Sequence, residues 1–218
     1  MGGIYTRHLE GVRWDVNTTT HPTVEPITLA QAKSHLRYTG TDAAEEAYIS
    51  RLVVASRLTI EEQTNRTFHQ TARTLTLDRW PRHVTVLLPY PPIISVASVK
   101  YYDPDGAQQT VSSGNYRVIT TAEPGRVEPI STFAWPTIQT RAAAIEVAYL
   151  SGYITTAGGP ADMAAARAQS IEAVYLLLEH WYRNRAATAD KMQYPIGLGV
   201  DALTCNDRCN EHLMEEMR

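Results

Sequence analysis

The feature that most constrains the fold is a change of residue pattern near the middle of the chain. Residues 71–150 contain short runs in which apolar and polar side chains alternate, and turn-forming residues separate these runs. Asp105-Gly106, between two such runs, is a strong hairpin signal. The expected strands are 71–78, 84–89, 95–102, 116–119, 125–129 and 144–149. The sequence therefore predicts a small antiparallel β module of about six strands.

Helical patterns flank this module on both sides. Thr28, with Gln31 three residues later, forms a capping-box pattern that starts a short helix. A long, two-sided helix is expected over residues 42–65, and a third helix over residues 160–185. The predicted fold class is therefore α+β, in which a small helical bundle carries an inserted antiparallel β module.

The helix expected over residues 160–185 has the clearest periodicity in the chain. Its apolar stripe repeats at three- and four-residue steps, and further apolar residues widen it, so the helix is expected to pack against more than one neighbour. Pro160 suits the first turn, and Arg183 and Arg185 place positive charge at the C-terminal end, where the helix dipole favours it. The stripe consists of Ile171, Val174, Leu178 and Trp181, widened by Ala173, Tyr175, Leu177 and Tyr182.

The two ends of the chain are expected to lie outside these units. Residues 1–27 are predicted to be an extended arm, and residues 187–218 a tail that orders on a partner. Pro195, Gly197 and Gly199 disfavour a continuous helix in the tail. The predicted division is 1–27 for the arm, 28–70 with 160–186 for the helical core, 71–152 for the β module and 187–218 for the tail.

Composition and charge argue against two classes of protein. The formal charge is 20 − 23 = −3 with no basic tract, whereas a dedicated nucleic-acid binder usually has a basic face. No apolar run approaches the roughly 20 residues that a membrane-spanning helix needs, and no signal peptide is expected. A chain made in the cytoplasm is the resulting expectation.

The sequence contains none of the common motifs of catalysis or metal binding. The histidines have no metal-ligand spacing, and Glu179-His180 point about 100° apart on a helix. Cys205, Cys209 and His212 lack a fourth ligand, so two reduced thiols on a helix surface are expected. Trp80, Trp135 and Trp181 are expected to fill the core. The sequence therefore predicts no enzyme, no cofactor and no metal site.

Several stretches in order along the chain resemble the phage head–tail connector (adaptor) proteins of the gp6-like superfamily, in its longer branch with a β insertion. The resemblance spans roughly residues 24–203 and includes the Trp135-Pro136 pair. The matching stretches are 25–37, 61–66, 75–78, 88–93, 96–99, 101–106, 116–118, 124–126, 147–153, 180–185 and 195–199. Each stretch alone is weak, and their order makes the resemblance specific.

The resemblance implies a structural protein of the virion neck, assembled in the bacterial host cytoplasm. Members form a ring, commonly of twelve copies, beneath the portal protein. They extend the channel through which genomic double-stranded DNA passes without sequence-specific binding. They also dock a stopper, tail terminator or other tail component. A moderately acidic chain agrees with a channel that must not grip phosphates.

Three surfaces are hypothesised on this basis. The tail is expected to bind the portal, the helix over residues 42–65 to pack on a neighbouring copy, and the β module to face outward or toward the next tail component. The portal-binding set is Met192, Tyr194, Ile196, Leu198, Val200, Leu203, Leu213, Met214 and Met217. The ring-interface set is Tyr48, Arg57, Glu61, Arg183 and Arg185.

Two other classes of function stay open at this point. A DNA-packaging or DNA-binding helical module, such as a small terminase subunit, would require a basic recognition helix, and the sequence contains none. An enzyme with an unrecognised site is the other alternative.

Overall fold

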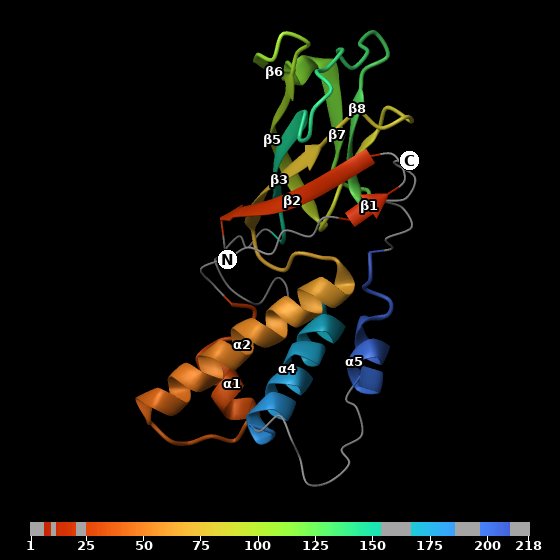
Figure 1. The fold of residues 1–218 in the computed structure, drawn as a ribbon. Helices are drawn as coiled ribbons and strands as arrows, with labels where there is room; N and C mark the ends of the chain where they lie inside the picture. Colours follow the sequence, from red (N-terminus) through yellow and green to blue (C-terminus); the bar gives the residue numbers. More distant parts are fainter. Residues whose placement is uncertain (1–6, 10–11, 21–24, 154–166, 186–196, 210–218) are drawn as a thin grey trace. The chain divides into compact units, whose positions relative to one another are not determined.

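The computed structural model describes residues 7–9, 12–20, 25–153, 167–185 and 197–209. The chain divides into two compact units, a β unit that includes residues 65–153 and a helical unit that includes residues 25–64 and 167–208 (Figure 1). Helices and antiparallel sheets are thus segregated into separate units, and the predicted α+β class is confirmed.

The β unit contains two antiparallel sheets. The larger has six strands in the order β1-β2-β3-β9-β5-β6, and the smaller has three in the order β4-β8-β7. The bounds are β1 Arg7–Leu9, β2 Val12–Thr20, β3 Thr71–Leu77, β4 Val86–Leu88, β5 Ile93–Tyr102, β6 Gln108–Thr110, β7 Tyr116–Ile119, β8 Gly125–Pro129 and β9 Ile145–Ser151, with a short 3-10 helix η1 at Ser113–Asn115. The six strands predicted from the alternation correspond to β3, β4, β5, β7, β8 and β9.

One hydrophobic core lies between the two sheets. The central strand β9 alternates strictly, so that Ile145, Val147 and Tyr149 are buried while the residues between them are half-buried. Val86 and Val127 of the smaller sheet belong to the same core. The period of two residues places every second side chain on the inner face, which is why the alternation predicted these strands well.

Residues 12–20, predicted to belong to a separate arm, form a strand of the larger sheet instead. β2 pairs antiparallel with β3 and carries β1 on its other edge. Val12 is buried in the core of the β unit, and Trp14 and Val16 pack against that core. Three apolar residues at alternate positions make β2 amphipathic, so the hydrophobic effect holds this segment in the sheet.

The helical unit contains α1 Leu29–His35, α2 Ala43–Thr64, α4 Ala168–Arg183 and α5 Gly197–Thr204. The capping box predicted at the start of α1 is present: the Gln31 amide donates to Thr28 Oγ1 at 3.2 Å, and the Thr28 amide donates to Gln31 Oε1 at 2.8 Å. α2 lies beside α4 (Figure 1), and α4 also contacts α1 and α5. The expectation that α4 has more than one neighbour is confirmed.

The predicted helix over residues 160–185 is shorter than expected at both ends. Arg167 adopts φ −142° and ψ 51°, which is outside the helical region, so α4 does not run continuously from Pro160. Asp207 lies at its first turn, where it accepts a hydrogen bond from the Ser170 hydroxyl and pairs with Arg167 at 2.8 Å. Arg185 lies beyond the last helical residue, Arg183. Residues 160–166 lie outside the described part of the chain.

A helix also occurs where glycines argued against one. α5 begins at Gly197 and buries Val200 and Thr204. Gly197 and Gly199 have low helix propensity, which destabilises α5. Burial against α4 offsets this cost. The predicted helical run from Asp207 does not start there, since residues 207–209 are not helical, and residues 210–218 lie outside the described part.

Candidate interaction surfaces

A cluster of charged and aromatic side chains lies where α2 begins and α4 ends. The Arg185 guanidinium lies 4.8 Å from the ring centre of Tyr48 and 5.0 Å from that of Tyr182. Its carboxylate partner is Glu45 of α2. The two tyrosine rings are 6.3 Å apart. Because Arg185 is exposed and the two tyrosines are only half-buried, this cluster presents a cation and aromatic surface to solvent.

Acid is expected to weaken this cluster by protonating Glu45. A hydrogen bond from Tyr182 holds the pKa of the Glu45 carboxyl below its ordinary value, and Arg185 adds to the effect. Since the folded pKa is depressed, the contribution of Glu45 is present above the ordinary glutamate pKa of about 4.3 and is lost as the pH falls through the folded value. The difference in Tm between wild type and Glu45→Gln should therefore shrink below about pH 4.3. The exposed Glu172 supplies the control Glu172→Gln, and a Glu45→Gln difference that stays constant with pH would contradict this.

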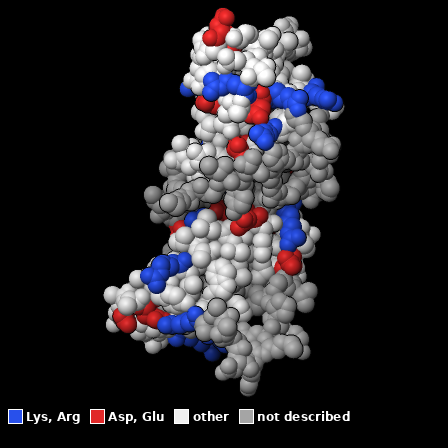
Figure 2. All heavy atoms as spheres, viewed as in Figure 1, with Lys and Arg blue, Asp and Glu red and all other residues white. Residues whose placement is uncertain are grey.

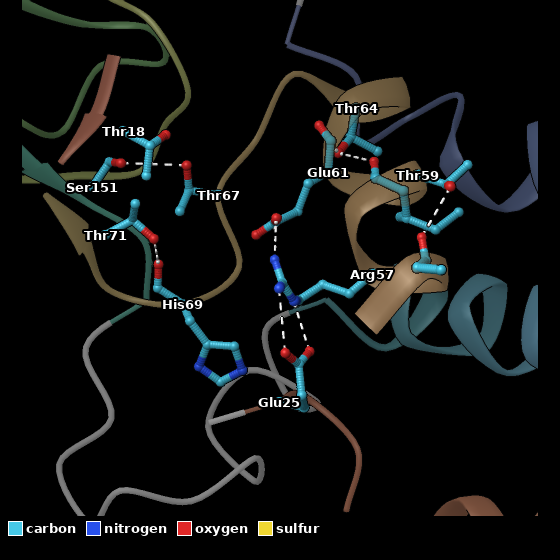
Figure 3. Close-up of polar contacts among 12 residues, drawn as sticks. Thr18, Glu25, Arg57, Thr59, Glu61, Thr64, Thr67, His69, Thr71 and Ser151 are labelled. Carbon is cyan, nitrogen blue, oxygen red and sulfur yellow. Dashed lines mark hydrogen bonds and ion pairs between the residues drawn. The ribbon is translucent and has the colours of Figure 1, made fainter. Parts of the chain in front are cut away.

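Arg57 does not belong to an exposed interface, contrary to the prediction. Its side chain is 6% exposed and binds two carboxylates of the same chain, Glu25 at 2.7 Å and Glu61 at 2.6 Å (Figure 3). Burial acts to lower the pKa of Arg57, but the hydrogen bonds that its guanidinium donates to Glu25, together with the charge of Glu61, outweigh burial and raise the pKa. Arg57 therefore ties α2 to Glu25 in the segment before α1, and contacts within the chain occupy the side chains of Arg57 and Glu61, which leaves little of either for a neighbouring copy.

The outer face of α2 is the alternative surface for a neighbouring copy. Ile49, Val53 and Ile60 are buried, and position 58 points about 200° away from position 60 around the helix. Leu58 is accordingly 50% exposed, and Arg51, seven residues before it on the same face, is exposed as well. Leu58 is thus an exposed apolar side chain on an otherwise solvated helix face.

The first part of the predicted portal-binding tail is integrated in the helical unit. Val200 is 2% exposed and Leu203 is half-buried, and Asp207 is fastened to Ser170 and Arg167 of the α4 start. Val200 is therefore withdrawn from the portal-binding set, because it has no surface to offer a partner. Met192, Tyr194, Ile196, Leu213, Met214 and Met217 lie outside the described residues, as does the side chain of Leu198.

Comparisons with known proteins point to virus-like particles. No protein-family model and no curated protein matches the sequence. A chain from the virion of a native gene transfer agent (GTA) particle superposes with a TM-score of 0.70 at 25% identity, covering 89% of this chain and 95% of that one. A chain from the neck of an empty GTA particle, computed with C6 symmetry, gives 0.71 at 24% identity with the same coverage. A chain from the neck of a native GTA particle, computed with C12 symmetry, superposes with a TM-score of 0.64 at 22% identity, and it covers 89% of this chain and 95% of that one.

These likenesses extend over most of both chains, so the fold is shared as a whole and not through one unit alone. Among the residues described here, no three His, Cys, Asp or Glu side chains gather as metal ligands. None of the described helices combines the length and apolarity that crossing a bilayer needs. On the face in Figure 2, Lys and Arg side chains are interspersed with Asp and Glu.

Arg183 is exposed and pairs with Glu179 at 2.5 Å. With Tyr48 and Arg185 it lies where α2 begins and α4 ends. The cysteines are both free, and Cys205 is exposed as expected, but Cys209 is buried, which raises the pKa of its thiol.

Sequence reasoning did not single out Leu58 as an exposed apolar residue of α2. The heptad spacing to Arg51, opposite the buried stripe, was the signal that could have identified it. The described Trp80, Trp135 and Trp181, predicted as core residues, are only half-buried.

Proposed function

We propose that this chain is a structural component of the neck of a phage-like particle, where copies of it form a ring beneath the portal and dock the next tail component. The likeness to a GTA virion chain over 89% of this chain carries the proposal. The ring is supported by the C6 and C12 symmetries of the neck structures that the chain resembles. No catalytic role is assigned to any residue.

The ring contact is assigned to the outer face of α2 together with the cluster of Tyr48, Arg183 and Arg185. Leu58 is half exposed in the isolated chain, and burying its side chain between two copies would contribute on the order of 1 kcal/mol per copy. Arg51 has no carboxylate partner within the described residues, so a neighbouring copy can supply one. Twelve such contacts around a closed ring would add to a stable assembly even if each is weak.

The substitution Leu58→Glu tests the ring. It places a charge in the proposed contact while leaving the buried stripe of α2 intact, so we expect a folded monomer where wild type forms rings. Native mass measurement and electron microscopy of purified chain supply the readout. Val84→Glu is the matched control, because Val84 is equally exposed (52%) but lies in the β unit. If Leu58→Glu forms rings as well as the control does, α2 is not the contact.

The tail stays a proposal in its original role. Residues beyond Cys209 are proposed to bind the portal, since α5 and Asp207 hold the preceding segment on the helical unit. A chain that ends at Cys209 tests this assignment in a pull-down with the portal protein. We expect it to lose portal binding, and undiminished binding would exclude the assignment. The genomic DNA is proposed to pass the ring without base-specific contacts, in keeping with the net charge of −3.

A further inference from the structure

The β unit carries a preorganised aromatic patch, here defined as Trp80, Val84, Phe133 and Trp135. The two indole rings stack with centres 4.3 Å apart and an interplanar angle of 8°, and Phe133 meets Trp135 edge-on. Trp80 Nε1 donates to the Pro136 carbonyl at 2.9 Å, and Trp135 Nε1 donates to the Val84 carbonyl at 2.6 Å. Both indole N–H groups are satisfied inside the chain, so the ring surface left half-exposed is apolar.

Val84 is the unusual member of the patch. Its φ of 58° lies in the left-handed region, which is unfavourable for a β-branched residue. Its amide donates to the Pro81 carbonyl at 3.1 Å, which closes the turn. The side chain is 52% exposed, so burial within the chain offsets little of the strain. A strained backbone that displays an apolar side chain to solvent is a feature found at functional surfaces.

Unpaired positive charge borders the patch. Arg79 and Arg82 flank Trp80 in the same loop, and both are exposed. Within the described residues, no carboxylate pairs with Arg79 or Arg82. The adjacent Asp78 is turned away, since its Oδ1 accepts from the Ala143 amide at 2.8 Å. The loop therefore combines an apolar centre with a cationic rim, which is the arrangement of a protein–protein hot spot.

We propose that this patch docks a segment of another protein in which an aliphatic or aromatic side chain lies next to Asp or Glu residues. The apolar side chain would cover Val84 and the exposed edges of the tryptophans, and the carboxylates would pair with Arg79 and Arg82. A nucleic acid fits less well. Trp80 and Trp135 already stack on each other, so each has one ring face fewer on which a base could stack. The surface is distinct from the α2 contact.

A photo-cross-linker tests the docking directly. p-Benzoylphenylalanine replaces Val84 in full chains incorporated into particles by cells that lack the unmodified chain, and the cross-linked peptides are sequenced. We expect one peptide of a different protein, with Asp or Glu within a few residues of the attachment point, at least tenfold above the same probe at the exposed Arg117. Cross-links to DNA, to copies of this chain, or at the level of the control position would overturn the proposal.

The variant Val84→Asn separates docking from stability. Asparagine tolerates the left-handed region, so we expect the Tm of the isolated chain to fall by at most about 2–4 °C, which is the shift that a change of about 1 kcal/mol produces. Ring formation should be unchanged, because the α2 contact is untouched. Particle yield should fall about tenfold, as loss of one interface anchor predicts. An unchanged yield, or a yield that falls only together with Tm, would overturn the docking role. Loss of rings in Leu58→Glu would still support the neck assignment independently.

Discussion

Replacing Arg57 by methionine is expected to destabilise the helical unit by about 3 kcal/mol, the low end of the range for breaking a buried ion pair. Methionine fills a similar volume, but the carboxylates of Glu25 and Glu61 then lose their cation. Glu61 is only 12% exposed and Glu25 is 24% exposed, so solvent compensates Glu25 more than Glu61. The loss arises from uncompensated buried charge and not from a lost surface contact.

Hydrogen exchange of α2 amides measures this effect without requiring the two units to unfold together. A change of 3 kcal/mol corresponds to exchange that is on the order of 100-fold faster. Arg51→Met on the exposed face of the same helix is the control and should change the stability by less than about 0.5 kcal/mol. Combining Arg57→Met with Glu25→Gln and Glu61→Gln should recover part of the loss. Equal exchange in Arg57→Met and Arg51→Met would show that the network has no stabilising role.

The same residue illustrates what the sequence could not reveal. Arg57 and Glu61 lie on α2 in a pattern that equally suits a solvated helix face. Glu25, whose contact buries Arg57, is 32 residues away, and no local pattern indicates that pairing. Charge reversal at Arg57 and Glu61 would therefore disrupt the helical unit, and it would report on folding and not on ring formation.

Local chemistry, in contrast, predicted several elements closely. Asp105-Gly106 joins β5 to β6, with Gly106 at φ 85°, because a tight hairpin requires a residue that adopts a positive φ. The capping box at Thr28 started α1 as predicted. β7 and β8 occupy the predicted residues because turn signals bound both runs. In each case the determining residues are within a few positions of one another.

Elements that depend on distant partners were missed. β2 has an alternating Val12, Trp14 and Val16, but the neighbouring threonines and Pro22 favoured an irregular arm in the prediction. Only its pairing with β3, more than 50 residues later, makes it a strand. α5 contains two glycines and is held by packing on α4. Tertiary contacts overrode local preference in both segments.

Gly152→Ala is expected to have the largest effect in the β unit, a loss of at least about 4 kcal/mol or failure to fold. A Cβ at this position would lie 2.2 Å from the carbonyl oxygen of His69 and 2.8 Å from the amide nitrogen of Gln70. Both obstacles are backbone atoms, so no side-chain rotation relieves the clash. The φ of 112° is also outside the left-handed region that other residues adopt.

The clash falls where two segments of the β unit meet. The Gly152 amide donates to the Pro92 carbonyl at 2.8 Å, and the next amide, of Tyr153, donates to the Phe68 carbonyl at 3.2 Å. Moving the strand away to admit a methyl group would break these bonds and separate the end of β9 from the residues before β3. Thermal unfolding and soluble yield of Gly152→Ala supply the measurement. Gly114→Ala is the control, because its nearest obstacle is 4.0 Å away and its stability should change by less than about 0.5 kcal/mol. If Gly152→Ala and Gly114→Ala have the same Tm, the two segments can separate without loss of stability. The close approach at Gly152 would then not be what holds β9 at this end of the sheet.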